Sequence, residues 1–175
     1  MLPPAYYIPG NDFYFGYHDS ENTLDGGDGN DSLFGGRMDD MLFGGTGDDF
    51  LSGGRGDDFL AGGDGNDYIR GGPGNDTLVG NAGTDTLIGE EGSDIFRFEQ
   101  AADSLFEQAD LIMDFVPGTD KIELCFAEET YRWTSWFDGT NTHLYLDNVA
   151  EFELLLSGEI TLSHQDLLFG TLLSN

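Results

Sequence analysis

Large apolar residues recur at every ninth position through the first half of the chain. Eight nonapeptides follow one another without a gap from Gly26 to Arg97, and the eighth position of each is large and apolar. These residues are Leu33, Leu42, Leu51, Leu60, Ile69, Leu78, Leu87 and Phe96. One inward residue between two outward residues is the pattern of a short β-strand. The period therefore predicts an all-β solenoid with one strand in each repeat.

The polar positions of the repeat predict the turns between these strands. The first, second and fourth positions are mostly Gly, which adopts left-handed backbone angles and permits close approach of neighbouring chains. Two consecutive repeats then complete one turn of a flattened coil with two parallel sheets. We predict a right-handed parallel β-roll in which residues 18 positions apart stack on one another.

The sixth position is Asp in all eight repeats, and the predicted stacking sorts these residues into two columns. One edge of the roll carries Asp31, Asp49, Asp67 and Asp85, and the other edge carries Asp40, Asp58, Asp76 and Asp94. Isolated Gly-Asp turns usually use Asp only to bond the backbone. Stacked carboxylates, however, repel one another unless a cation lies between them.

Carboxylate and backbone carbonyl oxygens together form the ligand set that Ca²⁺ prefers. The gaps between stacked turns predict about six interior ions. The carbonyl donors are expected from glycines at the second and fourth positions: Gly27, Gly29, Gly36, Gly45, Gly47, Gly54, Gly56, Gly63, Gly65, Gly72, Gly74, Gly83 and Gly92.

Three residues depart from the glycine pattern. Met38 stands at a fourth position, and Asn81 and Glu90 stand at second positions. Asn tolerates left-handed angles, whereas Met and Glu adopt them at a cost. We therefore expect weaker or distorted metal sites beside Met38 and Glu90.

The chain divides into three parts on this basis. Residues 1–25 contain degenerate repeats, with Asp12 and Asn22 at sixth positions, and are expected to cap the roll formed by residues 26–97. Residues 98–175 are expected to form a C-terminal β cap. Strand-like patterns occupy residues 131–137, 142–147 and 151–156, and Ser163–Asp166 resembles the start of a helix.

The charge balance limits the classes of partner that the chain can bind. The chain has 34 acidic and 6 basic residues, for a net charge of −28. This charge argues against nucleic acid, anionic lipid or acidic polysaccharide as the partner and favours metal cations. No apolar run is long enough to span a membrane, the N-terminus has no signal-peptide pattern, and Cys125 is the single cysteine.

The repeats resemble those of the RTX (repeats-in-toxin, hemolysin-type) calcium-binding proteins. Residues 93–98, 102–104, 109–115 and 118–124 also resemble the C-terminal domain of serralysin-type metalloproteases. The resemblance implies secretion into the extracellular space without an N-terminal signal peptide, through the type I apparatus and its signal in the last residues. Apart from this resemblance, the nine-residue spacing from Asp94 places Asp103 at the sixth position of a degenerate turn, where we expect it to close a seventh site under Asp85. Asp110, Asp114 and Asp120 are further candidates.

No catalytic motif accompanies the repeats. The sequence has neither HExxH nor G-x-S-x-G, and His18, His143 and His164 are scattered. The leading interpretation is a secreted, non-catalytic calcium-binding module for export, folding or interaction. The alternatives are an accessory domain of a larger secreted enzyme, and a carbohydrate or surface-adhesion module using Trp133 and Trp136.

The outer faces of the predicted sheets are unusually apolar. One face carries Met41, Phe43, Phe59, Ala61, Thr77, Val79 and Ile95, and the other carries Phe34, Phe50, Tyr68 and Ile88. We expect the C-terminal cap to cover the first face. A protein partner or self-association is the alternative.

Overall fold

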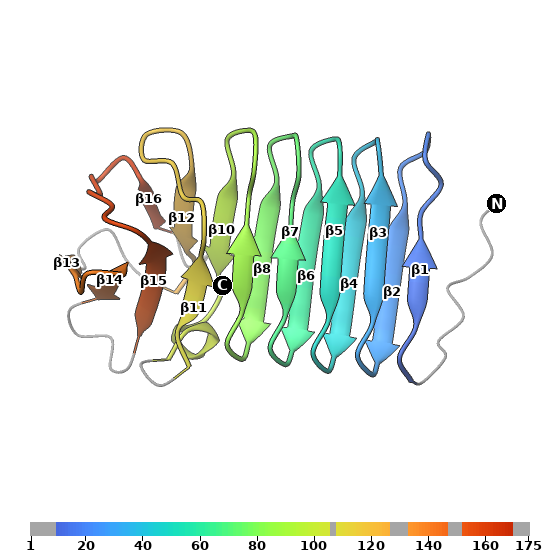
Figure 1. Cartoon of the computed structure of the whole chain (residues 1–175), viewed down its shortest axis with the longest axis horizontal. Helices are drawn as coiled ribbons and strands as arrows, with labels where there is room; N and C mark the ends of the chain where they lie inside the picture. Colours follow the sequence, from blue (N-terminus) through green and yellow to red (C-terminus); the bar gives the residue numbers. More distant parts are fainter. Residues whose placement is uncertain (1–9, 106–107, 127–132, 147–151, 170–175) are drawn as a thin grey trace, which may run out of the picture.

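The computed structural model describes residues 10–105, 108–126, 133–146 and 152–169. Its strands form two sheets that face each other along the roll (Figure 1). In spatial order, the nine-strand sheet contains β1 (Phe13–Phe15), β3 (Ser32–Gly36), β5 (Phe50–Gly54), β7 (Tyr68–Arg70), β9 (Thr86–Ile88), β11 (Asp110–Ile112), β15 (Glu153–Ser157), β14 (Asn141–Leu146) and β13 (Trp133–Phe137). The seven-strand sheet contains β16 (Leu167–Phe169), β12 (Lys121–Leu124), β10 (Ile95–Phe98), β8 (Thr77–Ala82), β6 (Phe59–Asp64), β4 (Met41–Thr46) and β2 (Thr23–Asp28).

The strand order confirms the parallel β-roll. Successive strands alternate between the sheets, and each strand pairs in parallel with the strand two places along the chain from β1 to β12. The register places Leu33 beside Leu51 and Leu42 beside Leu60. All eight apolar residues at the eighth positions have no exposed surface and form the centre of the core.

Most strands of the roll are longer than the three residues that the apolar pattern predicts, although β7 and β9 have three. β4 and β6 each continue through both glycines of the following repeat, and Gly45 pairs with Gly63. A Cβ on Gly63 would collide with the carbonyl oxygen of Gly45. Pairing therefore continues into the turns because these glycines carry no side chain.

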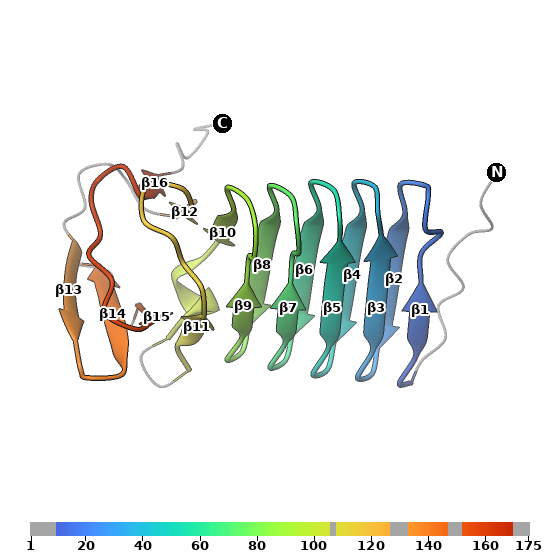
Figure 2. The same ribbon diagram turned by 45° about the horizontal axis from the view of Figure 1, so that its top comes forward.

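Within the described residues, the strands of the C-terminal part extend the stack and do not cover its outer face, which corrects the expectation for the cap. β11 and β12 continue the two sheets, β15 and β16 follow them in parallel, and the antiparallel hairpin β13–β14 ends the nine-strand sheet (Figure 2). The short 3₁₀ turn η1 (Ala101–Asp103) lies against β8, and Val79 there is 2% exposed. Met41, on the same outer face, remains 45% exposed.

The structure also corrects the helix expected to start at Ser163. Asp166 accepts the N–H of Ser163, as the third residue of a capping box would, and also the Ser163 hydroxyl, but Leu167–Phe169 is strand β16. Pairing of Leu167 with Ile122 keeps Leu167 in the core, so tertiary packing overrides the local helix signal. The three strand-like segments of the cap are strands β13, β14 and β15 over the residues described.

Candidate metal centre

The sixth-position aspartates form two columns along the edges of the roll. Each backbone N–H donates to the Oδ1 atom of the aspartate one turn farther along. The N···O distances are 2.7–2.8 Å in the column from Asp31 to Asp85 and 2.7–2.9 Å in the column from Asp40 to Asp94. All eight side chains are at most 3% exposed. The columns follow from the nine-residue period, because the bonded residues are 18 positions apart.

The second carboxylate oxygen of each aspartate is buried without a hydrogen-bond partner. This holds for Oδ2 of Asp31, Asp40, Asp49, Asp58, Asp67, Asp76, Asp85, Asp94 and Asp110. In each repeat Oδ2 lies against the first glycine of the same turn, as Asp49 does against Gly44. A buried charged oxygen without a partner is strongly unfavourable in the absence of a cation. The columns therefore fit a hard divalent ion such as Ca²⁺.

The glycines of neighbouring turns stack closely on one another along the edges of the roll. Gly45 and Gly47 have φ angles of 112° and 118°. A Cβ atom on Gly45 would collide with the carbonyl oxygen of Gly27, and one on Gly47 with that of Gly29. No three His, Cys, Asp or Glu side chains converge on one point within the described residues. A metal ion in this roll would therefore depend on carbonyl oxygens as much as on carboxylates.

Most of the predicted donor glycines share this turn geometry, but Gly36 does not. Gly27, Gly29, Gly45, Gly47, Gly54, Gly56, Gly63, Gly65, Gly72, Gly74, Gly83 and Gly92 all have positive φ. In the repeat that contains Met38, neither Gly36 nor Met38 is left-handed, and the carbonyl of Gly36 accepts the N–H of Arg55 at 3.1 Å. This turn changes its conformation and so avoids the strain that Met38 would otherwise suffer.

Asn81 and Glu90 do adopt left-handed angles, with φ of 71° and 75°. The turn at Glu90 gains a support that the sequence pattern did not indicate. Asp114 accepts the N–H groups of Gly89 and Glu90 at 3.0 and 2.8 Å. Asp114 therefore stabilises the strained turn and does not extend a carboxylate column.

Burial raises the pKa of Asp40 and of the column carboxylates that follow it along the chain. The pKa rises from 3.8 to about 6 at Asp49, Asp85 and Asp94, to about 7 at Asp58 and Asp67, and to about 8 at Asp76. Desolvation is the largest cause in each case, and neighbouring carboxylates add to it, whereas the backbone N–H bond opposes it. The folded columns therefore favour a bound cation or protons over bare charges.

The prediction for Asp103 is wrong in its position. The carboxylate that follows Asp85 in the column is Asp110, whose Oδ1 accepts the N–H of Asp85 at 2.8 Å. Asp103 instead binds the N–H groups of Glu99 and Gln100 at the start of η1. The nine-residue period ends at η1, and the added residues place Asp110 next in line. Asp103 lies near enough that its charge raises the pKa of Asp85 and Asp110.

The ends of the columns differ in chemistry. Asp110 is fully buried, its Oδ2 has no partner, and desolvation raises its pKa to about 9. On the other edge Asp120 follows Asp94, and its two oxygens accept the N–H groups of Asp94 and Val116 at 3.1 and 2.8 Å. At the N-terminal end of that edge, Asn22 donates its amide to Asp40 at 2.8 Å. Backbone and amide groups thus close this column at both ends.

A second ladder along the exposed edges was missed by the sequence reasoning. Its side chains, at the fifth position of the repeats, accept the backbone N–H of the next turn. The side chain of Asn30 accepts the backbone N–H of Asp48, and the side chain of Asp48 accepts the backbone N–H of Asn66. On the other edge the side chain of Asp57 accepts the backbone N–H of Asn75. The signal was present in the sequence, because the fifth position is Asn or Asp in repeats one to six.

Comparisons with known proteins agree with this geometry. The family described as RTX calcium-binding nonapeptide repeat matches in four copies, over residues 19–42, 34–69, 61–96 and 70–105. A search of curated proteins gives no significant match. No helix in the described ranges is long and apolar enough to cross a membrane.

Solved structures that match this chain include two subunits of a mannuronan C5-epimerase from Azotobacter vinelandii. AlgE6R3 is 32% identical, and the match covers 75% of this chain and 78% of AlgE6R3. AlgE6R2 is 33% identical, and the match covers 81% of this chain and 94% of AlgE6R2. The TM-score is 0.40 in both cases. The extracellular lipase LipA from Serratia marcescens is 15% identical over 87% of this chain and 40% of its own, with a TM-score of 0.41.

Proposed function

Because residues 19–105 carry RTX calcium-binding nonapeptide repeats, we propose that this chain is a secreted, non-catalytic calcium-binding module whose roll folds when Ca²⁺ binds. The observation that supports the proposal most strongly is the row of buried Oδ2 atoms without partners along both edges. In this proposal residues 26–97 are the calcium-binding roll, and residues 1–25 and 98–175 are its caps.

The proposed ligands of each ion are an aspartate of one column and glycine carbonyls of the adjacent turns. Each inner aspartate, such as Asp49 or Asp67, borders two gaps and would serve two ions. Interior gaps account for about six ions. Asp110, with Asp103 beside it, is the proposed source of carboxylates for a seventh.

The expected binding energy is large enough to decide folding. Extracellular calcium modules bind with Kd of about 10⁻⁴ to 10⁻³ M. With free Ca²⁺ at about ten times Kd, each ion contributes about 1.4 kcal/mol, so six contribute roughly 8 kcal/mol. A domain is usually stable by only about 5–15 kcal/mol in total. A roll without metal would also retain its mutual carboxylate repulsion, so we expect it to be largely unfolded.

The ion count tests the proposed ligands. Metal analysis of the full chain after equilibrium dialysis against Ca²⁺ should give about six or seven ions. The Asp110→Asn variant should lose one ion, whereas Asp120→Asn should lose none, because both oxygens of Asp120 already bind N–H groups. A chain that binds no more than about two ions, or equal counts for both variants and the unchanged chain, would contradict the proposed sites.

Export is proposed to follow the type I route, with folding delayed until the chain meets extracellular calcium. Low calcium inside the cell would keep the chain unfolded for passage through the apparatus. Co-expression with a type I apparatus should deliver the full chain to the medium, and removal of its last ~50 residues should retain it in the cell. Equal export of both forms would exclude a C-terminal signal.

A further inference from the structure

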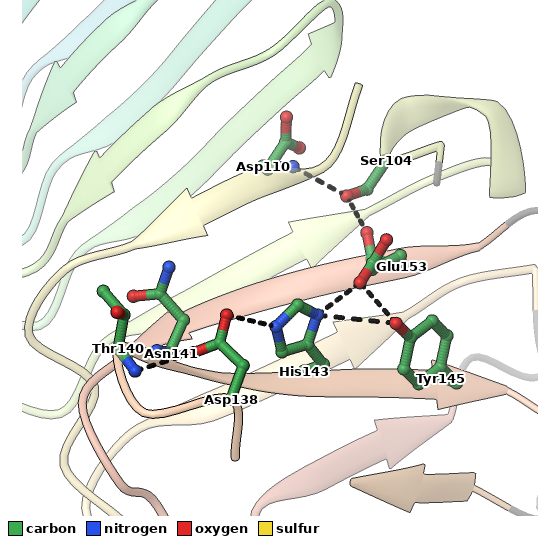
Figure 3. A network of polar contacts seen from close by, with 8 residues as sticks. All are labelled: Ser104, Asp110, Asp138, Thr140, Asn141, His143, Tyr145 and Glu153. Atoms are coloured by element: carbon green, nitrogen blue, oxygen red, sulfur yellow. Dashed lines mark hydrogen bonds and ion pairs between the residues drawn. The ribbon is translucent and has the colours of Figure 1, made fainter. Parts of the chain in front are cut away.

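A histidine lies between two carboxylates where the hairpin β13–β14 meets β15 (Figure 3). Antiparallel pairing places His143 opposite both Trp136 and Leu155, and Tyr145 opposite Glu153. These side chains share the outer face of the nine-strand sheet, remote from the inner core residues Leu144 and Leu154. The cluster is separate from the aspartate columns.

Both ring nitrogens of His143 face a carboxylate oxygen. Nδ1 lies 2.5 Å from Oε1 of Glu153, and Nε2 lies 3.1 Å from Oδ2 of Asp138. A neutral imidazole has one N–H and one lone pair, so it would point a lone pair at one of these oxygens. The imidazolium donates to both. The geometry therefore selects the protonated ring.

Glu153 needs this positive charge because it has little contact with water. Its side chain is 5% exposed. Besides His143, its Oε1 accepts the hydroxyl hydrogen of Tyr145 at 2.6 Å. Loss of the proton on His143 would leave a single N–H for the two carboxylates and would remove the positive charge beside the buried Glu153, which is unfavourable.

Trp136 covers the imidazole ring. The two ring centroids are 4.5 Å apart with an angle of 12° between the planes, and the side chain of His143 is 15% exposed. An indole face stabilises a cation lying against it. Trp136 and His143 lie on adjacent strands of the hairpin, while Glu153 lies on β15, so the cluster connects all three strands.

The electrostatics of the ring agree with this geometry. Burial lowers the pKa of His143, but the hydrogen bonds to Glu153 and Asp138 outweigh it, so the pKa is raised above 6.5. The N–H groups of Asn141 and Thr140 and the ring of His143 lower the pKa of Asp138 to about 2. Asp138, Tyr145 and Glu153 are the titratable groups that contact His143 in the described structure.

The backbone of Glu153 joins this cluster to the end of a metal column. The Ser104 hydroxyl donates to the Glu153 carbonyl oxygen and accepts the N–H of Asp110 at 2.9 Å. Glu153 in turn donates its N–H to the carbonyl of Ser104 at 3.0 Å. The strand that receives the bond from His143 is therefore fixed directly to the last turn of the roll.

We propose that His143 is a proton-dependent latch that holds the hairpin β13–β14 on β15 when protonated and releases it when the ring loses its proton. A folded-state pKa above the unfolded value gives stability that is fully present below the unfolded pKa and is lost as the pH rises through the folded one. The hairpin is therefore closed in mildly acidic medium and opens in alkaline medium, while the roll stays folded on its calcium.

The test uses the full chain saturated with Ca²⁺. NMR titration of the His143 ring should give a midpoint clearly above the ordinary value of ~6.5. Hydrogen exchange of β13–β14, corrected for the intrinsic rate, should show protection falling at least ~10-fold between about pH 6 and about pH 9, relative to β3–β7. A ring midpoint at or below ~6.5 would overturn the proposal, and so would equal protection at both pH values.

Two variants separate the latch from a merely structural role. His143→Gln should remove the pH dependence of hairpin exchange, and His164→Gln should keep it, because His164 contacts Trp133 and not the cluster. If His143→Gln fails to fold, Tyr145→Phe serves instead. The Tyr145→Phe variant removes one donor to Glu153, so Glu153 depends more on the imidazolium. Protection of the hairpin β13–β14 should therefore fall more steeply as the pH rises. Wild-type pH dependence in His143→Gln, or an unchanged response in Tyr145→Phe, would contradict the latch.

Discussion

At the scale of single residues, the two oxygens of each column aspartate have different environments. Oδ1 of Asp67 accepts the N–H of Asp49, which fixes the carboxylate within the stack, and Oδ2 has no protein partner. An asparagine can keep the first interaction but has no negative charge for a cation. The proposed metal requirement therefore depends on one oxygen atom of each repeat.

Asp67→Asn tests this division of roles against Asp48→Asn, which removes one negative charge from the exposed fifth-position ladder. Asp67 borders two proposed ions, so its variant should lose roughly 2–3 kcal/mol of stability in Ca²⁺. Without metal at neutral pH it should be at least as structured as the unchanged chain, because a buried charge is gone. Chemical denaturation with calcium and with chelator measures both effects. Equal losses for Asp67→Asn and Asp48→Asn in calcium would count against the ligand role.

Glycine at the turn positions is required by contact as well as by backbone angle. Gly63 has φ of 119° and faces the Gly45 carbonyl, whereas Gly158 has φ of 85° with no atom within 4 Å of an added Cβ. Gly63→Ala should destabilise the calcium-loaded roll by at least about 3 kcal/mol, and Gly158→Ala by about 1 kcal/mol. Thermal unfolding in excess Ca²⁺ compares them. Similar losses in the two variants would mean that close stacking is unimportant.

At the scale of elements, burial of the columns makes the metal-free roll sensitive to pH. In the folded roll the pKa values of Asp58, Asp67 and Asp76 are about 7, 7 and 8, against 3.8 in an exposed chain. The folded form thus holds more protons. The resulting stability is fully present below about pH 4 and is lost as the pH rises through about 6 to 8.

Protonation of the buried carboxylates in acid should therefore stabilise the metal-free roll, as bound Ca²⁺ is proposed to do. In chelator, the circular dichroism of the chain should gain strand signal as the pH falls from about 8 to about 5. In saturating Ca²⁺ the signal should already be complete at the upper end of this range. A metal-free chain that loses strand signal on acidification over the same range would show that the buried carboxylates do not control folding.

The repeats were predictable because one short period fixes several features at once. The position of Leu51 in the period determines its inward direction, and that of Asp49 determines its column. The same reasoning failed at Asp103, because η1 breaks the period and Asp110 follows Asp85 after 25 residues. Spacing cannot indicate which carboxylate continues a column once the repeat has ended.

The latch cluster could not be predicted from sequence either. Trp136, His143 and Glu153 are seven and ten residues apart, and they meet only through the register of two antiparallel pairs. Trp136 lies on the surface and is 53% exposed, so no burial pattern marks it as a partner of His143. Hairpin register depends on turn geometry and packing, which no repeat specifies here.

At the scale of the whole molecule, the chain carries a net charge of −28 and its roll has a narrow core. The core of the roll consists mainly of two columns of apolar residues, one from each sheet, and carboxylates line both edges. Hydrophobic burial favours this arrangement, and charge repulsion together with carboxylate desolvation opposes it. Cations at the edges remove much of the repulsion, so we expect folding and calcium binding to be a single cooperative event.

A calcium titration of the full chain followed by circular dichroism at neutral pH tests this account most directly. The account predicts little strand signal in excess chelator and a steep, cooperative rise as Ca²⁺ is added, with Mg²⁺ at equal concentration giving much less because it demands a smaller octahedral site. Strand signal already complete in chelator would contradict it, because the roll would then fold without the ions for which its two aspartate columns are proposed.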